Sequence, residues 1–321
     1  MIQLADCFVL QRPLDTDSDA HFNPPAARQK RARSTTSTAQ RKRDRGTDGF
    51  TDVILTLEER VDLSLADRIL QRLDVDSSQY KELRKYRDAY GASSTLSVNY
   101  HRKDYNIGRL YPRPHISLGV MQRALRGALC GNMFDVDMEN AHPTFLLKEA
   151  ETRGWRCARL REYVEDRERV LAHISDDRTA AKVAVLSLIN NGSLKPAHEN
   201  VAYLRELHAE LRGIRDGIWE THTEIRKLVE SGSRSNPRAS ATSFFMADRE
   251  QRALLCVAEA FQSRGWEVAT LVYDGLMVYK NPEKSIDTDL PLVEADLEVH
   301  CGANVKLSIK PWDSSLLEGG I

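Results

Sequence analysis

Two aspartates separated by a single residue stand in an otherwise apolar part of the chain. Asp135 and Asp137 belong to the segment MFDVDMENAHPTFLL, residues 133–147. On a strand, residues two positions apart point to the same side. Removing two carboxylates from water costs several kcal/mol unless a positive charge compensates them, and a metal ion is the simplest compensation. The pair therefore indicates a candidate metal site, although a strand end with solvated acids has the same pattern.

A second group of polar residues lies in SDDRTAAKVAVLSLINNGS, residues 175–193. Arg178 and Lys182 are four residues apart and so are neighbours on one helical face, which Asn190 continues. Two cations above a polar side chain suit a strip that grips phosphates. An ordinary solvated helix face would produce the same pattern.

The third group is LVYDGLMVY, residues 271–279, in which Asp274 and Gly275 form a strong hairpin signal between two apolar strands. Strands this apolar predict a hairpin packed into the core, with its turn held rigidly. A rigid carboxylate is what a metal site needs. Because Asp-Gly is also a very common hairpin dipeptide, the segment taken alone indicates only a turn.

Composition restricts the classes of protein to which the chain can belong. Its 321 residues, 41% of them hydrophobic, suffice for a sizeable core. The net charge of −1 means that nucleic-acid affinity would depend on local patches. Five scattered cysteines without a C-x-x-C pair argue against a zinc site or a disulfide framework and indicate a reducing compartment. Without a membrane-length apolar run or a signal-peptide pattern, we expect an intracellular protein with no membrane partner.

The first fifty residues differ from the rest of the sequence. The segment RQKRARSTTSTAQRKRDRG, residues 28–46, has almost no apolar side chain and predicts a disordered basic tail over 1–50. Its two basic clusters, Arg28–Arg33 and Arg41–Arg45, would also suit a nuclear address in a eukaryotic setting or a non-specific nucleic-acid arm.

The remaining chain is predicted to be α+β, with few strands, which carry the carboxylates, and many helices inserted between them. Periodicity and turn signals locate the elements. In order, we expect helix from Thr51 to Gly91, extended structure over 94–113, helix and then a strand up to 139, mainly helix over 143–230, a loop over 231–241, a long helix ending at Gly265, a β-hairpin over 266–281 and a last strand in 303–312.

Taken in order, the three groups resemble the palm and fingers of family A DNA polymerases and single-subunit phage-type RNA polymerases, and most closely the short transposon- and virus-encoded polymerases related to them. DVDMENAHPTFLL, R-x-x-x-K…LINNGS and LVYDGLMV carry the resemblance, with IGRLYPR upstream. It covers roughly residues 95 to 310. It implies a palm of a small antiparallel sheet with a carboxylate-bearing hairpin, interrupted by helical fingers. The implied domains are a disordered tail (1–50), a helical, thumb-like N-terminal region (51–130), the palm with the first Asp motif (131–150), a fingers-like insertion (151–240) and the palm with the hairpin Asp motif (241–321).

The resemblance also implies an activity and roles for individual residues. The enzyme would replicate DNA by extending a primer–template with nucleoside triphosphates, using two Mg²⁺ ions for which Mn²⁺ can substitute. Asp137 and Asp274 would bind the metals, with Asp135 as an alternative or second ligand, and Lys182 would protonate the leaving group. The implied nucleotide-binding residues are Arg178, Lys182, Asn190, His142 and Asn140, and the implied nucleic-acid-binding residues are Arg109 and Arg113.

The sequence departs from the family pattern at three positions, and alternatives follow. Asn190 stands where these enzymes usually have Tyr, His142 replaces another polar residue that faces the sugar, and Tyr273 precedes the hairpin aspartate where better-known relatives have His. The choice between ribo- and deoxyribonucleotides is therefore open. An RNA polymerase or primase on the same fold, a nucleotide-sugar glycosyltransferase that uses the D-x-D, and an inactive nucleic-acid-binding relative remain as alternatives.

Overall fold

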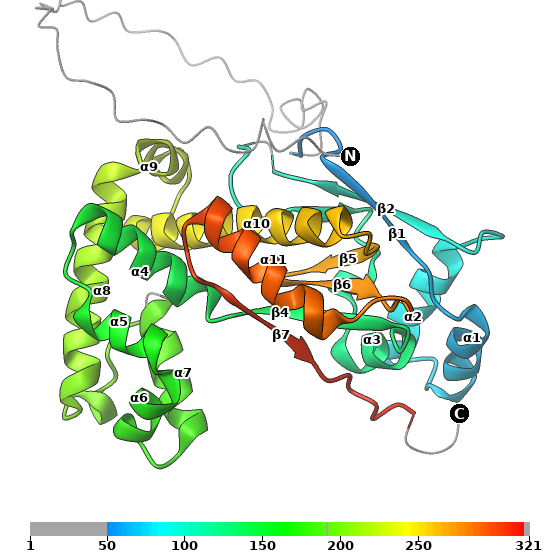
Figure 1. Cartoon of the computed structure of the whole chain (residues 1–321), viewed down its shortest axis with the longest axis horizontal. Coiled ribbons are helices and arrows are strands. Elements are labelled where there is room, and N and C mark those ends of the chain that lie inside the picture. The colour runs from blue at the N-terminus through cyan, green and yellow to red at the C-terminus, as the bar shows by residue number, and fades with distance from the viewer. Residues whose placement is uncertain (1–49, 104, 191, 318–321) are drawn as a thin grey trace, which may run out of the picture. The chain divides into compact units, whose positions relative to one another are not determined.

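The structure is a computed structural model that describes residues 50–103, 105–190 and 192–317. The predicted basic tail and both of its arginine-rich clusters lie outside these residues. Thr51–Ile321 forms one unit of structure. It is α+β, as predicted, because its helices are combined with two small antiparallel sheets (Figure 1).

The larger sheet contains the strands predicted around both aspartate motifs. It has the order β5-β6-β4-β7, and every neighbouring pair is antiparallel. Its strands are β4 (Met133–Glu139), β5 (Val268–Val272), β6 (Gly275–Tyr279) and β7 (Lys306–Lys310). The central pair β4–β6 therefore joins segments that are more than 130 residues apart in the sequence, which brings the two motifs side by side.

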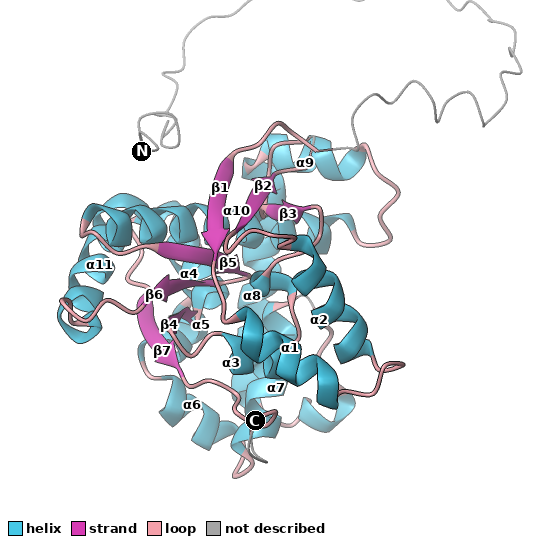
Figure 2. Cartoon of the chain, turned by 90° about the vertical axis from the view of Figure 1, so that its right-hand side faces the viewer, coloured by secondary structure: helices cyan, strands magenta, loops and turns pink. Residues whose placement is uncertain are grey.

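Helices pack on both faces of this sheet. Helix α10 (Pro237–Ser263) contacts β5 and β6, and α11 (Ile286–Cys301) contacts α10 and β7. On the other face, α3 (Arg123–Leu129) shares a core cluster with Met133 and Met277. Figure 2 shows α11 on one side of the sheet and α1 to α3 on the other. Both faces are thus covered in part, and Asp135 and Asp137 of β4 remain half-buried.

The alternation along β4 determines where its carboxylates point. Met133 belongs to the core cluster that includes α3, and Asp135 and Asp137 follow it at intervals of two residues, so all three share one face. In the register, Asp135 is opposite Met277 and Asp137 is opposite Gly275. Asp137 thus lies next to the hairpin turn, whereas Asp135 lies further back along the strand.

A second sheet corrects the prediction for the start of the N-terminal region. The sequence predicted helix from Thr51, but β1 (Leu55–Glu59) is a strand that pairs with β2 (Leu96–His101), which pairs in turn with β3 (Tyr111–Arg113). The segment LTLEE alternates strictly between buried and exposed residues, and this period of two allows pairing with β2. The predicted helix therefore began too early, because the helical pattern applies only from Leu63 onward.

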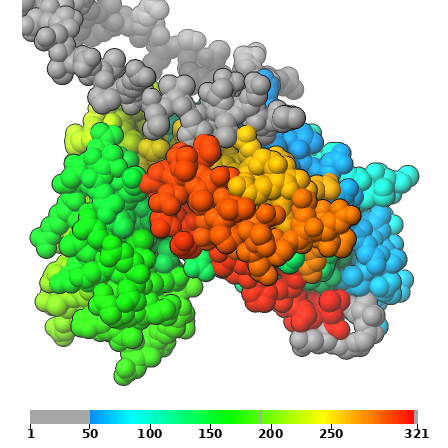
Figure 3. All heavy atoms as spheres, viewed as in Figure 1, coloured from blue at the N-terminus to red at the C-terminus, as the bar shows by residue number. Residues whose placement is uncertain are grey.

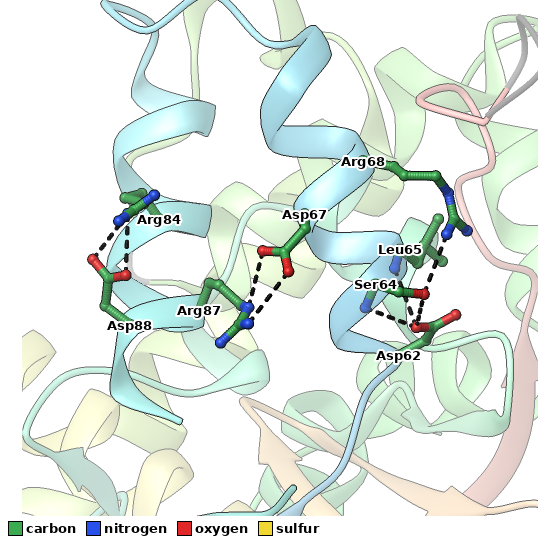
Figure 4. Close-up of polar contacts among 8 residues, drawn as sticks. All are labelled: Asp62, Ser64, Leu65, Asp67, Arg68, Arg84, Arg87 and Asp88. Atoms are coloured by element: carbon green, nitrogen blue, oxygen red, sulfur yellow. Dashed lines mark hydrogen bonds and ion pairs between the residues drawn. The ribbon is translucent and has the colours of Figure 1, made fainter. Parts of the chain in front are cut away.

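Two helices follow β1 as predicted, α1 (Leu63–Arg72) and α2 (Ser78–Ala89). Helix α1 begins where the Asp62 carboxylate accepts hydrogen bonds from the backbone N–H groups of Ser64 and Leu65, at 2.9 and 3.1 Å. An ion pair of 3.0 Å between Asp67 and Arg87 joins the two helices (Figure 4). A short 3₁₀ turn, Leu118–Val120, then leads to α3.

The described residues between β4 and α10 form six helices, in agreement with the helical pattern over 143–230. All six contribute to one core cluster that includes Leu160, Val185 and Leu204, and they stand to one side of the larger sheet (Figure 1). They are α4 (Ala141–Arg153), α5 (Ala158–Glu165), α6 (Arg167–Ile174), α7 (Arg178–Ile189), α8 (Ala202–Thr221) and α9 (Thr223–Glu230), with a 3₁₀ turn at Pro196–His198.

Two helices extend beyond the sequence prediction. Helix α10 begins at Pro237, inside the predicted loop, because the Asn236 side chain accepts a hydrogen bond from the N–H of Ala239 and proline is tolerated in a first turn. Helix α11 was not predicted, and it continues through Pro291. Among the described residues, no helix has both the length and the apolar character needed to cross a membrane.

Candidate active site

A cavity of about 810 Å³ opens between the larger sheet and the inserted helices. Figure 3 shows the surface hollowed between the helices coloured green and the red segment that carries β7. The side facing the sheet, here called the sheet wall, includes Asp137, Asp274 and Glu250. The opposite side, the helix wall, includes Glu168, Arg178 and Lys182. The predicted site residues that line the cavity are Arg109, Asp137, Asn140, His142, Arg178, Lys182 and Asp274.

The hairpin turn brings Asp274 to the end of β4. Tyr273 and Asp274 form the two-residue loop, and Gly275, predicted as part of the turn, instead opens β6. A Cβ atom at Gly275 would lie 2.4 Å from the Val136 carbonyl oxygen, so only glycine allows the two strands to approach this closely. The Asp274 carbonyl oxygen accepts a hydrogen bond of 3.1 Å from the N–H of Met138, and this bond fixes the hairpin against β4.

The carboxylates of the sheet wall are crowded with negative charge. Burial raises the pKa of Asp274, and the nearby charges of Asp137 and Glu250 raise it further, while Arg109 opposes them. Asp137 has a cationic partner in Lys310, whose Nζ lies 2.7 Å from its Oδ2. Lys310 projects from β7, and the sequence analysis did not single it out. The Asp274 carboxylate is half-buried, and its raised pKa shows that nearby positive charge does not fully offset burial and the neighbouring carboxylates.

These two carboxylates fit a magnesium site that is completed by substrate. The described residues contain no cluster of three or more His, Cys, Asp or Glu side chains arranged to hold a metal. Magnesium, however, is commonly bound through one or two carboxylates together with substrate phosphates and waters. Asp137 and Asp274 provide such a pair in one cavity, and a divalent cation would relieve the repulsion that raises the Asp274 pKa.

Asp135 occupies a different environment from Asp137. It is absent from the described lining of the cavity, and it lies level with Lys310 on β7. Burial raises its pKa, an effect that Arg126 opposes and the charge of Asp137 increases. The structure thus places Asp137, and not Asp135, in the described lining of the cavity, and the metal-ligand roles of both residues stay predictions.

Glu250 is a charged group to which the sequence analysis assigned no role. It is only 2% exposed, with Oε1 2.6 Å from Nε of Arg109 and Oε2 2.8 Å from Nε2 of His142. Burial alone would raise its pKa, but His142 and Arg109 together lower it below the usual value. Glu250 follows Met246 and precedes Leu254 at intervals of four residues, so the 3.6-residue period could have indicated its buried position.

The segment that carries Arg109 is fixed along α10 by its backbone. The N–H of Gly108 donates to Oδ1 of Asp248 at 3.1 Å, and the N–H of Leu110 donates to Oε1 of Gln251 at 2.8 Å. Both acceptors are buried. Gly108 and Leu110 are thus held on either side of Arg109. The Arg109 guanidinium lies 5.8 Å from the centre of the ring of Tyr273, which is in the loop of the hairpin.

The helix wall presents its cations from the first two turns of α7. The helix begins because the Asp177 carboxylate accepts hydrogen bonds from the N–H groups of Thr179 and Ala180. Arg178 is its first residue, and Lys182 follows one turn later on the same face, as predicted. Both line the cavity. Arg178 is also bound by Glu168 of α6, at 2.6 and 2.7 Å.

Three further predicted residues have distinct positions. Asn140 lines the cavity, and it is the residue before α4, with a left-handed backbone (φ of 52°). Asn190 caps the end of α7, and Arg113 lies on β3 opposite Asn99. Neither Asn190 nor Arg113 is among the described residues that line the cavity. Their predicted roles in binding nucleotide and nucleic acid stay predictions.

Comparison with known proteins gives one distant similarity. No protein-family model matches the chain. The chain is 27% identical over 240 residues to a protein of Sputnik virophage whose name is "Putative helicase V13". The match covers 69% of this chain but only 30% of the virophage protein, so the chain spans less than a third of that relative's length. The similarity relates the chain to a viral protein and shows no polymerase family.

Proposed function

We propose that this chain is a template-directed nucleotidyltransferase that adds nucleotides to the 3′-hydroxyl of a DNA primer. One observation carries the proposal: a single cavity has the carboxylates Asp137 and Asp274 on one wall and the cations of Arg178 and Lys182 on the other. Nucleotidyl transfer requires divalent metal at the reacting phosphate and positive charge around the leaving phosphates. The two walls offer the side chains for each requirement.

The viral relative supports the broader class of activity. A helicase name indicates a viral enzyme that acts on nucleic acid, and a polymerase belongs to that class. Helicase activity is not proposed for this chain, because its sequence contains no G-x-x-x-x-G-K-[ST] segment, the phosphate-binding loop of P-loop NTPases.

Each wall would have a separate task. Asp137 and Asp274 would hold two Mg²⁺ ions, and the chemistry that these would supply is activation of a primer hydroxyl and neutralisation of charge on pyrophosphate. The planar fork of Arg178 suits two phosphate oxygens at once, and Lys182 would hold a proton for the leaving group. Arg109 and the Tyr273 ring would offer a cation and a stacking surface to the nucleic acid.

The position of Asp135 distinguishes this proposal from the glycosyltransferase alternative. A D-x-D that binds a nucleotide sugar through a metal would use the carboxylates of the D-x-D itself. Here the described lining of the cavity includes Asp137 but not Asp135, and the second carboxylate is Asp274 from the hairpin. The arrangement therefore favours a site shared between two strands.

The proposal can be tested with the purified full chain. Primed and unprimed templates of DNA and of RNA are each given deoxyribonucleotides or ribonucleotides, with Mg²⁺ or Mn²⁺. We expect primer extension in at least one combination, and the productive combination identifies the template, the sugar and the ability to start a strand. An Asp274→Asn sample serves as the control for contaminating polymerase. Failure to incorporate any nucleotide in every combination would reject the proposal.

A further inference from the structure

Glu168 places a carboxylate among the cations of the helix wall. Its Oε2 lies 2.7 Å from Nε of Arg178, and its Oε1 lies 2.6 Å from Nη2 of the same guanidinium. The hydrogen bond from Arg178, together with the charges of Arg178, Arg167 and Lys182, lowers the pKa of Glu168, so the group is an anion at neutral pH. All four side chains line the same cavity.

The contact has the geometry with which arginine binds phosphate. Two parallel N–H donors of a guanidinium meet two oxygens of either a carboxylate or a phosphate in the same fork-like manner. Glu168 therefore engages the donors of Arg178 that a phosphate entering the cavity would need. A phosphate and Glu168 cannot both accept these two hydrogen bonds.

The fold does not depend on this ion pair. The side chains of Glu168 and Arg178 are 63% and 58% exposed, and ion pairs in this setting contribute little to stability. The two helices also have their own N-terminal caps, since Asp166 accepts from the N–H of Arg169 and Asp177 accepts from the N–H of Thr179. Opening the pair would therefore leave the surrounding structure intact.

We propose that Glu168 stands in for phosphate on Arg178 and sets the affinity of the cavity for the triphosphate of its substrate. This inference rests on the proposed function, because it assigns Arg178 to the triphosphate. A triphosphate carries several negative charges and displaces the single carboxylate. The observed affinity is then reduced by the fraction of molecules in which Arg178 is already occupied.

Inorganic tripolyphosphate is the probe, because it has the charge of the substrate without base or sugar. In calorimetric titrations of the full chain at about 0.1 M salt, we expect Glu168→Gln to lower the dissociation constant about three- to fivefold. Glu168→Asp keeps the charge but cannot reach both donors, and it should lower the constant by a smaller factor. An uncharged nucleoside should bind equally to all these forms.

The matched control is Glu165→Gln. Glu165 is an exposed glutamate that lines the same cavity and ends the preceding helix, and its replacement changes the net charge by the same amount. Equal tightening by Glu165→Gln and Glu168→Gln, or no tightening by Glu168→Gln, would overturn the role of Glu168. Arg178→Gln and Lys182→Gln separate the two proposals. If neither of these weakens tripolyphosphate binding, the triphosphate assignment of the helix wall fails as well.

Discussion

The two walls of the cavity hold their charges in opposite ways. On the sheet wall, Glu250 is 2% exposed and is enclosed by Arg109 and His142, and Asp274 is fixed by the pairing of β4 with the hairpin. On the helix wall, Arg178 and Glu168 are both more than half exposed and contact each other across two short helices. Acidic and basic side chains are therefore held in place on the sheet wall, whereas on the helix wall they can exchange one partner for another.

Under the proposed function, this difference would separate two kinds of contribution to catalysis. A buried charge held by close partners has little freedom to move when a ligand arrives, so it would fix where reacting atoms lie. An exposed pair can exchange its partner for a ligand, so it adjusts affinity. Changes on the sheet wall should consequently abolish chemistry or damage the fold, whereas changes on the helix wall should alter the concentration of substrate that is required.

The largest effect is expected from the carboxylates of the sheet wall. Replacement of Asp274 or Asp137 by Asn should lower turnover by on the order of 10³-fold, because a lost metal ligand removes several kcal/mol of transition-state stabilisation. Single-turnover primer extension measures this, and binding of primer–template should change little. Asp135→Asn is the matched control, with an expected loss of about tenfold, the low end for a residue that only supports a ligand. A reversed order, with Asp135 the more sensitive residue, would move the site away from the cavity.

The next effect concerns stability. Replacing Glu250 by Ala leaves Arg109 and His142 without their buried anion and should cost about 3 kcal/mol. For a folded unit of this size, the melting temperature should fall by about 5–10 °C. Thermal unfolding followed by circular dichroism tests this. Glu168→Gln, which breaks an exposed pair, should shift the melting temperature by less than about 2 °C. Similar shifts of the melting temperature in the two variants would contradict the view that charges on the sheet wall stabilise the fold and charges on the helix wall do not.

A smaller effect is expected for the ammonium group of the helix wall. Lys182→Ala should raise the triphosphate concentration for half-maximal extension about tenfold, as expected for one charge-assisted contact to phosphate. Steady-state extension over a range of triphosphate concentrations measures it. Lys195→Ala, at an exposed lysine that follows α7 outside the described lining, is the control and should leave that concentration unchanged. An equal effect of both variants would indicate general charge rather than a specific contact.

The pH profile should show the raised pKa of Asp274. Because burial and the charge of Asp137 raise it, Asp274 gains its proton at a higher pH than an ordinary aspartate, whose pKa is about 4. At divalent-metal concentrations well below saturation, where most of the protein is metal-free, turnover should therefore fall on the acid side at a midpoint above that value, and saturating metal should lower this midpoint. The pKa of Glu250, by contrast, is lowered in the folded protein. Glu250 therefore stabilises the fold above the pKa that it has in the unfolded chain, and this stabilisation is lost as the pH falls through its lower folded-state pKa. Loss of turnover at a pH where the circular dichroism stays unchanged would support both predictions. A turnover midpoint near 4 would contradict the raised pKa of Asp274.

Local patterns in the sequence were enough to locate the strands and the helix that line the candidate site. The alternation in MFDVD predicted the strand β4, the apolar runs around Asp274 predicted the β5–β6 hairpin, and the spacing of Arg178 and Lys182 predicted a shared helical face. Each of these signals, whether a spacing along a strand or helix or an apolar run around a turn dipeptide, is expressed by a short segment alone. The same local reasoning failed at β1, where pairing with the distant β2 decided the structure.

Contacts between distant segments could be decided only by the tertiary structure. The register of β4 against β6 and β7 selected Asp137 over Asp135 for the cavity and brought Lys310 to it. The packing of α10 against the 107–110 segment enclosed Glu250 between two cations. The side-by-side arrangement of α6 and α7 gave Glu168 its partner. A sequence carries the charge and the period of each side chain, but which opposite charges meet depends on how elements pack, and that is a property of the whole fold.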